Sequence, residues 1–203
     1  QNIIDFARKN KVKLIINLST VTVYGDVKKG VLKEDYSPKN PNILGITKLI
    51  SEELLYKQKI NFINIRLPGV LCRSFKENTS RPWLNKIFYS IKKNKKINVY
   101  NFNSDFNNVI DTEELAKFIK FLIKKEIVIR DTFNFATTKP IKLKNIIKNI
   151  KLKLNSSSKI VNLSSKKESF VISIDKLIKK LNYKTISTQD IIQNNLKRFI
   201  LSF

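Results

Sequence analysis

Two short apolar segments with a long helical pattern between them constrain the fold of this chain most strongly. Residues 13–18 (KLIINL) form a continuous apolar run of the kind that is buried in a parallel sheet, and residues 61–66 (NFINIR) form a second strand. Between them, Pro41 leads into a helical pattern over residues 42–57. A helix that joins two parallel strands makes a crossover, and such crossovers are right-handed in nearly all sheets. The sequence therefore predicts an α/β fold.

The rest of the chain continues to alternate between helical and extended patterns. Apolar spacing and capping residues predict helices over residues 1–10, 82–93, from Thr112 onward, 141–154, 175–181 and 188–203. Short apolar runs predict strands over residues 97–100, 108–111, 132–136 and 159–163, and polar loops over residues 19–40, 155–158 and 164–169. The chain contains no internal repeat.

Composition excludes several classes of protein. The hydrophobic fraction of 42% is enough for a buried core, and no apolar run reaches the ~18 residues of a membrane span. With no histidine, the chain cannot form a histidine-based triad or a histidine-ligated metal site, and no metal site is predicted. The single cysteine, Cys72, cannot form a disulfide within the chain, which fits a reducing compartment and predicts a cytoplasmic protein.

The chain is strongly basic, with 40 Lys+Arg against 16 Asp+Glu and a formal charge of +24. Such a charge is typical of nucleic-acid-binding proteins. Only six of the basic residues are arginine, however, and no stripe of arginines and aromatic residues suited to base recognition is present. We therefore predict no specific nucleic-acid partner, and we keep polyanion binding as a third interpretation behind those given below.

Two motifs carry the candidate chemistry. The first, Ser19-Thr20-Val21-Thr22-Val23-Tyr24-Gly25, follows the first apolar strand, at the end of a strand where ligands bind in open α/β sheets. The second, Asn40-Pro41-Asn42-Ile43-Leu44-Gly45-Ile46-Thr47-Lys48, leads into Ser51-Glu52. Because the second motif starts a helix, Leu44 and Lys48 lie one turn apart on one face.

These motifs resemble those of the extended short-chain dehydrogenase/reductase superfamily, which includes the NAD-dependent epimerases and dehydratases of nucleotide sugars. Further stretches are similar to family segments in the same order: Ile65-Arg66-Leu67-Pro68-Gly69-Val70, Trp83-Leu84 with Ile97–Tyr100 and Asn101, residues 106–116, and Phe133-Asn134-Phe135-Ala136. The resemblance covers essentially the whole chain. It implies an incomplete Rossmann-type parallel sheet with a smaller α/β substrate domain.

The resemblance also implies roles for individual residues. Thr20 would hydrogen-bond the reacting oxygen, and Lys48 would bond the cofactor ribose and lower the pKa of a catalytic tyrosine one turn earlier. The implied catalytic positions are Thr20, Lys48 and Leu44, the last being the position of the family tyrosine. The implied cofactor-binding residues, for NAD or NADP, are Ser19, Lys48, Pro68, Gly69 and Val70. The implied substrate-binding residues are Thr20, Tyr24, Arg81, Tyr100 and Asn107.

The sequence departs from the family pattern at three places. Leucine at position 44 cannot transfer a proton, and Tyr24 is the nearby substitute candidate. Val21-Thr22 stands where dehydratases carry an Asp-Glu pair, so an epimerase or reductase is favoured over a 4,6-dehydratase. The glycine-rich fingerprint that binds the dinucleotide pyrophosphate is absent, which indicates a fragment without the first βαβ unit.

The predicted division is therefore residues 1–66 as the later part of the dinucleotide-binding domain and residues 67–203 as mainly substrate domain, with some segments returning to the sheet. Two interpretations of function follow. The chain belongs to an NAD(P)-dependent epimerase or reductase of nucleotide sugars, or to a catalytically silent homologue that binds a nucleotide or sugar. Apolar residues on helix 42–57 in excess of one sheet face predict a homodimer through this helix and helix 1–10.

Overall fold

The centre of the molecule is a parallel sheet of three strands in the order β1-β3-β8. The computed structural model describes residues 2–72, 83–164 and 168–202. Strand β1 (Ile15–Thr20) pairs with β3 (Phe62–Leu67), and β3 pairs with β8 (Arg130–Asn134). All six residues of β3 are buried, as expected for the middle strand of a covered parallel sheet.

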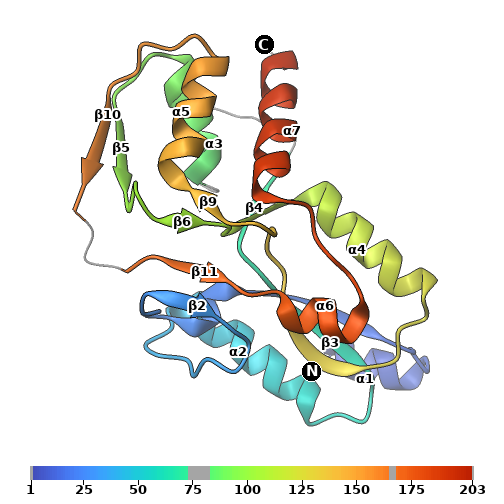
Figure 1. Ribbon diagram of the computed structural model, residues 1–203. Helices are drawn as coiled ribbons and strands as arrows, with labels where there is room; N and C mark the ends of the chain where they lie inside the picture. The colour runs from blue at the N-terminus through green and yellow to red at the C-terminus, as the bar shows by residue number, and fades with distance from the viewer. Residues whose placement is uncertain (1, 73–82, 165–167, 203) are drawn as a thin grey trace.

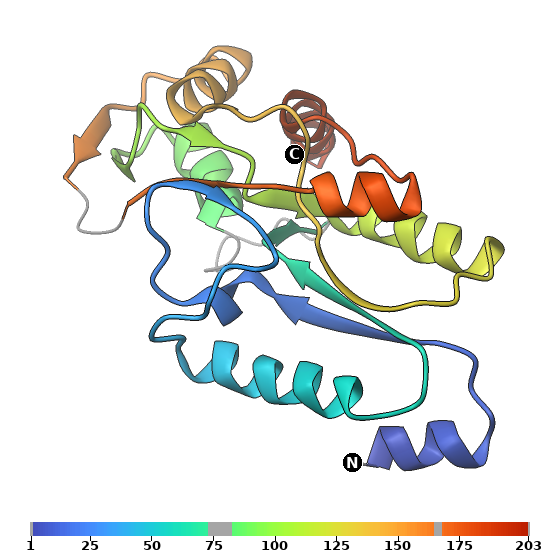
Figure 2. The same ribbon diagram turned by 60° about the horizontal axis from the view of Figure 1, so that its bottom comes forward.

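Helices cover both faces of this sheet (Figure 2). Helices α1 (Asn2–Lys9) and α2 (Ile43–Tyr56) lie on one side, and α4 (Thr112–Lys124) and α6 (Asp175–Leu181) lie on the other. Helix α2 starts where it does because the Asn42 side chain accepts a hydrogen bond from the backbone N–H of Gly45 at 2.9 Å. The crossover β1–α2–β3 is thus the unit that the sequence predicts.

A second group of elements lies apart from the sheet and contains the C-terminal helix (Figure 1). It consists of α3 (Trp83–Lys92), β5 (Ile97–Tyr100), α5 (Leu143–Lys153), β10 (Ile160–Leu163) and α7 (Thr188–Leu201). Strands β5 and β10 pair in parallel. The ring of Phe199 lies 5.5 Å from that of Phe88 and 5.2 Å from that of Tyr89, so aromatic packing joins α7 to α3.

Short strand pairs connect the two groups. Strand β2 (Gly30–Leu32) pairs in parallel with β11 (Phe170–Ile172), and β4 (Gly69–Leu71) pairs in parallel with β7 (Val109–Asp111). Strand β6 (Asp105–Phe106) pairs antiparallel with β9 (Ile141–Lys142). The β2–β11 pair ties a late segment of the chain to its early part, about 140 residues before it.

The predicted α/β Rossmann-type fold is confirmed, and most predicted elements are present within about two residues of their predicted bounds. The predicted loop over residues 19–40 is wrong in part, because it contains the short 3-10 helix η1 (Val21–Tyr24) and strand β2. Strand β11, which the sequence does not predict, directly follows the loop predicted over residues 164–169. The helix predicted from residue 141 starts at Leu143, and Asp111 rather than Thr112 caps α4.

Candidate functional site

The two sequence motifs meet at the carboxyl end of the sheet. Thr20 is the last residue of β1 and pairs in register with Leu67, the last residue of β3. The polypeptide leaves β1 into η1 and leaves β3 into Pro68 and then β4. This edge of the sheet therefore carries both the hydroxyl-rich turn and the Pro68-Gly69-Val70 segment.

The start of α2 packs against η1 at a distance that only glycine permits. A Cβ atom on Gly45 would lie 2.4 Å from the carbonyl oxygen of Thr22. Gly25 has φ +67°, and a Cβ atom there would lie 1.9 Å from the carbonyl oxygen of Lys39. The two glycines therefore belong to the packing between the motifs.

Thr20 and Lys48 both lie at this edge. The hydroxyl oxygen of Thr20 accepts hydrogen bonds from the backbone N–H and from the hydroxyl of Thr22, each at 3.2 Å. Thr20 is the acceptor in both bonds, so its own hydroxyl hydrogen can still donate. Lys48 donates from Nζ to the carbonyl oxygen of Leu18 at 2.7 Å. Leu44, one turn before Lys48, is 41% exposed and offers only an aliphatic group.

Ser19 points to the interior, on the other side of β1 from Thr20, as the alternation of strand side chains requires. It is buried, and its hydroxyl donates to Oε1 of Glu52 at 2.5 Å. Glu52 is also buried and forms an ion pair with Arg66, whose Nη2 lies 2.6 Å from Oε2. The hydroxyl of Ser19 therefore forms an internal hydrogen bond and does not face the edge that carries Thr20.

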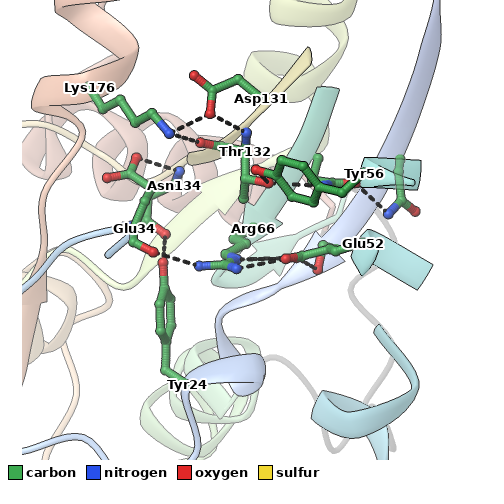
Figure 3. A network of polar contacts seen from close by, with 12 residues as sticks. Tyr24, Glu34, Glu52, Tyr56, Arg66, Asp131, Thr132, Asn134 and Lys176 are labelled. Atoms are coloured by element: carbon green, nitrogen blue, oxygen red, sulfur yellow. Dashed lines mark hydrogen bonds and ion pairs between the residues drawn. The ribbon is translucent and has the colours of Figure 1, made fainter. Parts of the chain in front are cut away.

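A buried polar network surrounds this ion pair (Figure 3). The Arg66 guanidinium lies 4.7 Å from the centroid of the Tyr24 ring, and its Nη1 donates to the carbonyl oxygen of Glu34 at 3.1 Å. Burial alone would lower the pKa of Arg66, but the hydrogen bonds that Arg66 donates to Glu52, together with the negative charge of Glu52, raise that pKa above its ordinary value. The permanently charged Arg66 thus links α2, β3 and the loop that follows β2.

Tyr24, which the sequence predicts as a substrate contact and as a substitute acid, lies in the core. Its side chain is fully buried, and its hydroxyl donates to Oδ1 of Asn134 at 2.6 Å. Burial raises the pKa of Tyr24 to about 12, although the nearby charge of Arg66 acts to lower it. A phenol so placed has no surface on which to meet a ligand.

A cavity of about 510 Å³ borders the network on the side of α6. Its wall includes Glu34 and the lysines at positions 176 and 180, both of which pair with Asp131 at 2.5 and 2.6 Å. Burial raises the pKa of Glu34. Burial alone would also raise the pKa of Asp131, but hydrogen bonds from the two lysines lower it below its ordinary value. The lining of this cavity thus carries charges of both signs.

Of the predicted substrate residues, Thr20 lies at the edge with Lys48, whereas Tyr100 and Asn107 lie elsewhere. Tyr100 is exposed beside Trp83 at a separate cavity of about 190 Å³. Asn107 is buried, and its amide donates to the carbonyl oxygens of Thr137 and Ile172 and accepts from the backbone N–H of Ile172, at 2.8–2.9 Å. The side chain of Asn107 thus holds β11 in place. Arg81 lies outside the residues that the structure describes.

The arrangement places a basic group and a hydroxyl together at one edge of the sheet. A lysine and a hydroxyl stand at the carboxyl ends of parallel strands, where dinucleotide cofactors bind. Gly25 and Gly45 are used in packing, and no glycine-rich turn between a strand and a helix start occurs in the described part of the chain. The described residues also contain no group of three potential metal ligands and no helix long and apolar enough to cross a membrane.

Sequence reasoning missed Glu52 and Arg66 as members of the site's interior. Both occur inside the motifs, Glu52 four residues after Lys48 and Arg66 near the end of the second strand. Opposite charges on the buried face of a helix and within an apolar strand are a recognisable signal, because a buried charge requires a partner.

Comparison with known proteins agrees with this geometry. Residues 1–136 match the model of the NAD dependent epimerase/dehydratase family. A curated relative, an uncharacterised protein of Methanocaldococcus jannaschii, is 27% identical over 205 residues, which cover 98% of this chain and 61% of that protein. The chain thus spans about 61% of the length of that relative.

Solved structures share the fold. The enzyme WbmG of Bordetella bronchiseptica, in complex with NAD and UDP, superposes with a TM-score of 0.82 at 16% identity, over 99% of this chain and 64% of that one. UDP-glucose 4-epimerase of Thermotoga maritima, with UDP-glucose, gives a TM-score of 0.79 at 16% identity, over 98% and 67%. Since the family match covers well over half of the residues, this chain belongs to the NAD dependent epimerase/dehydratase family.

Proposed function

We propose that this chain is part of an NAD(P)-dependent epimerase or reductase that acts on a nucleotide sugar by hydride exchange at a 4-keto or 4-hydroxyl group. The observation that carries the proposal is the placement of Thr20 and Lys48 at one sheet edge, with Lys48 Nζ 2.7 Å from the Leu18 carbonyl oxygen. Family membership and the NAD, UDP and UDP-glucose of the similar structures support it. Because the chain spans about two thirds of those proteins, the activity is proposed for the whole protein.

The residues of this edge have distinct proposed tasks. When bound, NAD or NADP supplies the hydride acceptor and donor. Lys48 binds the ribose hydroxyls in exchange for the Leu18 carbonyl, and Pro68, Gly69 and Val70 border the nicotinamide. Thr20 donates its free hydroxyl hydrogen to the reacting oxygen of the sugar. Ser19 contributes through its backbone, since its hydroxyl is bound to Glu52.

A 4,6-dehydratase is less well supported. Elimination of water needs an acid and a base beside Thr20, and the next two residues here are Val21 and Thr22. Thr22 Oγ1 donates to Thr20, which directs it back toward the strand end.

Leu44 favours a second candidate function, a catalytically silent homologue that binds nucleotide or sugar. The side chain is 41% exposed one turn before Lys48, so it stands where the family tyrosine would act but has no proton to give. Such a protein keeps the ribose contact of Lys48 and lacks the acid that completes the transfer.

The substitution Leu44→Tyr distinguishes the two candidates. Proton transfer by a positioned side chain contributes ~10²–10⁴-fold, so Leu44→Tyr in the whole protein should raise hydride exchange with a suitable nucleotide sugar by ~10²-fold or more. Cofactor affinity should change little, because Lys48 is untouched. The exposed neighbour Ile43, changed to tyrosine, is the matched control and should leave the rate unchanged.

Two outcomes would contradict the enzymatic proposal. If wild-type protein already turns over at ordinary rates and Leu44→Tyr adds nothing, another group is the acid. If neither form reacts but both bind a nucleotide sugar, the silent homologue is the correct function.

The partners and location complete the proposal. The ligand is a small-molecule nucleotide sugar, not a specific nucleic acid, and the protein forms a homodimer through the exposed faces of α1 and α2. A single cysteine, Cys72, in a chain of 203 residues supports a reducing, cytoplasmic environment.

A further inference from the structure

Two residues of α2, one helical turn apart, form hydrogen bonds with two consecutive residues of β1. Leu44, Lys48 and Glu52 follow one another at four-residue spacing, so they form one stripe along the helix. Lys48 donates to the carbonyl oxygen of Leu18 at 2.7 Å, and Glu52 accepts from the hydroxyl of Ser19 at 2.5 Å. These two bonds set how α2 is rotated against the strand that ends in Thr20.

The two bonds differ in burial. Lys48 is partly exposed at the surface, where water competes for the Leu18 carbonyl. Glu52 is only 2% exposed, so water does not compete for its bond with Ser19. The buried bond is therefore the more constant of the two.

Glu52 also connects α2 to the second strand of the edge. Arg66, on β3, donates from Nε to Oε1 at 3.1 Å and from Nη2 to Oε2 at 2.6 Å. Figure 3 shows these paired bonds and the position of Tyr24 under the same guanidinium. A two-bond arginine–carboxylate pair fixes orientation as well as distance. One carboxylate thus reaches both strands whose ends form the candidate site.

We propose that Glu52, acting through Ser19, is the positioning residue that places Lys48 against the nicotinamide-ribose half of the cofactor. The role toward the cofactor rests on the proposed function. The position of Lys48 on β1 can be measured without any assay of activity. Apolar contacts between a helix and a sheet are non-directional. A directional bond one turn beyond Lys48 is what prevents α2 from rolling and carrying the ammonium away from Leu18.

The sharpest variant is Ser19→Ala. It removes one bond of Glu52 and leaves the Glu52–Arg66 pair intact, whereas changing Glu52 would leave Arg66 as an uncompensated buried charge. Ser19→Thr keeps a hydroxyl and serves as the rescue variant. Ser158→Ala is the matched control, because Ser158 is a fully buried, hydrogen-bonded serine in the other group of elements.

Two readouts use the chain as it is: acylation of each lysine by a small amine reagent, followed by mass spectrometry, and hydrogen exchange of backbone amides. In Ser19→Ala, loss of the Ser19–Glu52 hydrogen bond should raise the acylation of Lys48 about five-fold, because α2 is then free to roll and open the Lys48–Leu18 bond, while the other lysines stay unchanged. Exchange should rise in the first turns of α2 and in η1 only. Ser19→Thr should restore both values, and Ser158→Ala should change neither.

The proposal is overturned if Ser19→Ala leaves the acylation of Lys48 unchanged, or if exchange rises throughout the chain as in a purely structural defect. In the whole protein, Ser19→Ala should raise KM for NAD(P) about five-fold with kcat less affected. Should the wild-type protein prove inactive, the proposed function fails, yet the acylation result still decides whether Glu52 positions Lys48.

Discussion

At the scale of single residues, the site contains two kinds of polar side chain. Some form hydrogen bonds with buried protein groups, and others keep a donor that a ligand can use. Ser19 and Thr20 are neighbours, but strand alternation sends one inward to Glu52 and leaves the other at the open edge. The sequence predicts both as site residues from their motif. The alternation of side chains along a strand is enough to predict that Ser19 and Thr20 point to opposite sides. The burial of Tyr24 could not be predicted in this way, because its partner Asn134 lies 110 residues away in the sequence.

The Tyr24–Asn134 bond makes a prediction about pH. Tyr24→Phe leaves the buried Oδ1 of Asn134 without its donor, so the free energy of unfolding at pH 7 should fall by about 1–3 kcal/mol. Burial raises the folded pKa of Tyr24 from 10.0 to about 12. The protonated Tyr24 hydroxyl therefore contributes fully to the free energy of unfolding below pH 10, and this contribution is lost as the pH rises toward 12.

Urea unfolding of wild type and Tyr24→Phe at pH 7 to pH 11 measures this effect. The gap between the two proteins should narrow above pH 10 by about 1 kcal/mol per pH unit, because only the wild type gains a tyrosinate on unfolding. Other titrating groups are common to both proteins. A gap that stays constant to pH 11 would mean that Tyr24 is not buried in solution.

At the scale of elements, the sequence predicts long helices and buried strands well and short paired strands poorly. The β1–α2–β3 crossover follows from apolar patterns that are local. Strand β2 has three residues and owes its conformation to β11, about 140 residues later, which no local pattern records. For the same reason, the sequence predicts a helix from residue 141, although the first two residues form strand β9 and α5 begins at Leu143.

Close approach of α2 to η1 makes a prediction at this scale. Gly45→Ala places a methyl group 2.4 Å from the carbonyl oxygen of Thr22, so either α2 or η1 must shift. The free energy of unfolding should fall by about 1–3 kcal/mol, although alanine is normally the better helix residue by ~1 kcal/mol. Thr47→Ala, at an exposed position on the same helix, should stay within ~0.5 kcal/mol of wild type.

Chemical denaturation followed by circular dichroism measures both variants. Equal or greater stability of Gly45→Ala would show that α2 does not approach η1 so closely in solution.

At the scale of the whole molecule, the charge of +24 is the most conspicuous property. If it reflects lysines spread over the surface, DNA binding should be equal for duplexes of unrelated sequence. Its association constant should fall steeply and linearly with salt on logarithmic axes. Fluorescence anisotropy with two labelled duplexes tests this expectation. Sequence-selective binding that survives salt of about 0.15 M would make nucleic acid the primary ligand.

The other property of the whole molecule is an apolar surface on the two helices that cover one face of the sheet. Ile4 of α1 packs with Leu55 of α2 and Phe62 of β3, so the two helices lie side by side on the sheet. The outer faces of α1 and α2 carry several substantially exposed apolar side chains: Ile3, Phe6, Ile46, Ile50 and Leu54. Contiguous apolar patches of this kind mark protein interfaces, whereas isolated apolar residues do not.

This surface predicts a homodimer in which α1 and α2 of one copy pack on those of the other. Analytical ultracentrifugation at micromolar concentration should give the mass of two chains. Ile50→Glu, at a residue of α2 that is 54% exposed, should shift the protein to monomer because each dimer would bury two carboxylates. Ile123→Glu, at a residue 64% exposed on α4, is the control and should leave the dimer intact. A wild-type monomer, or dissociation caused equally by Ile123→Glu, would place the interface elsewhere or remove it.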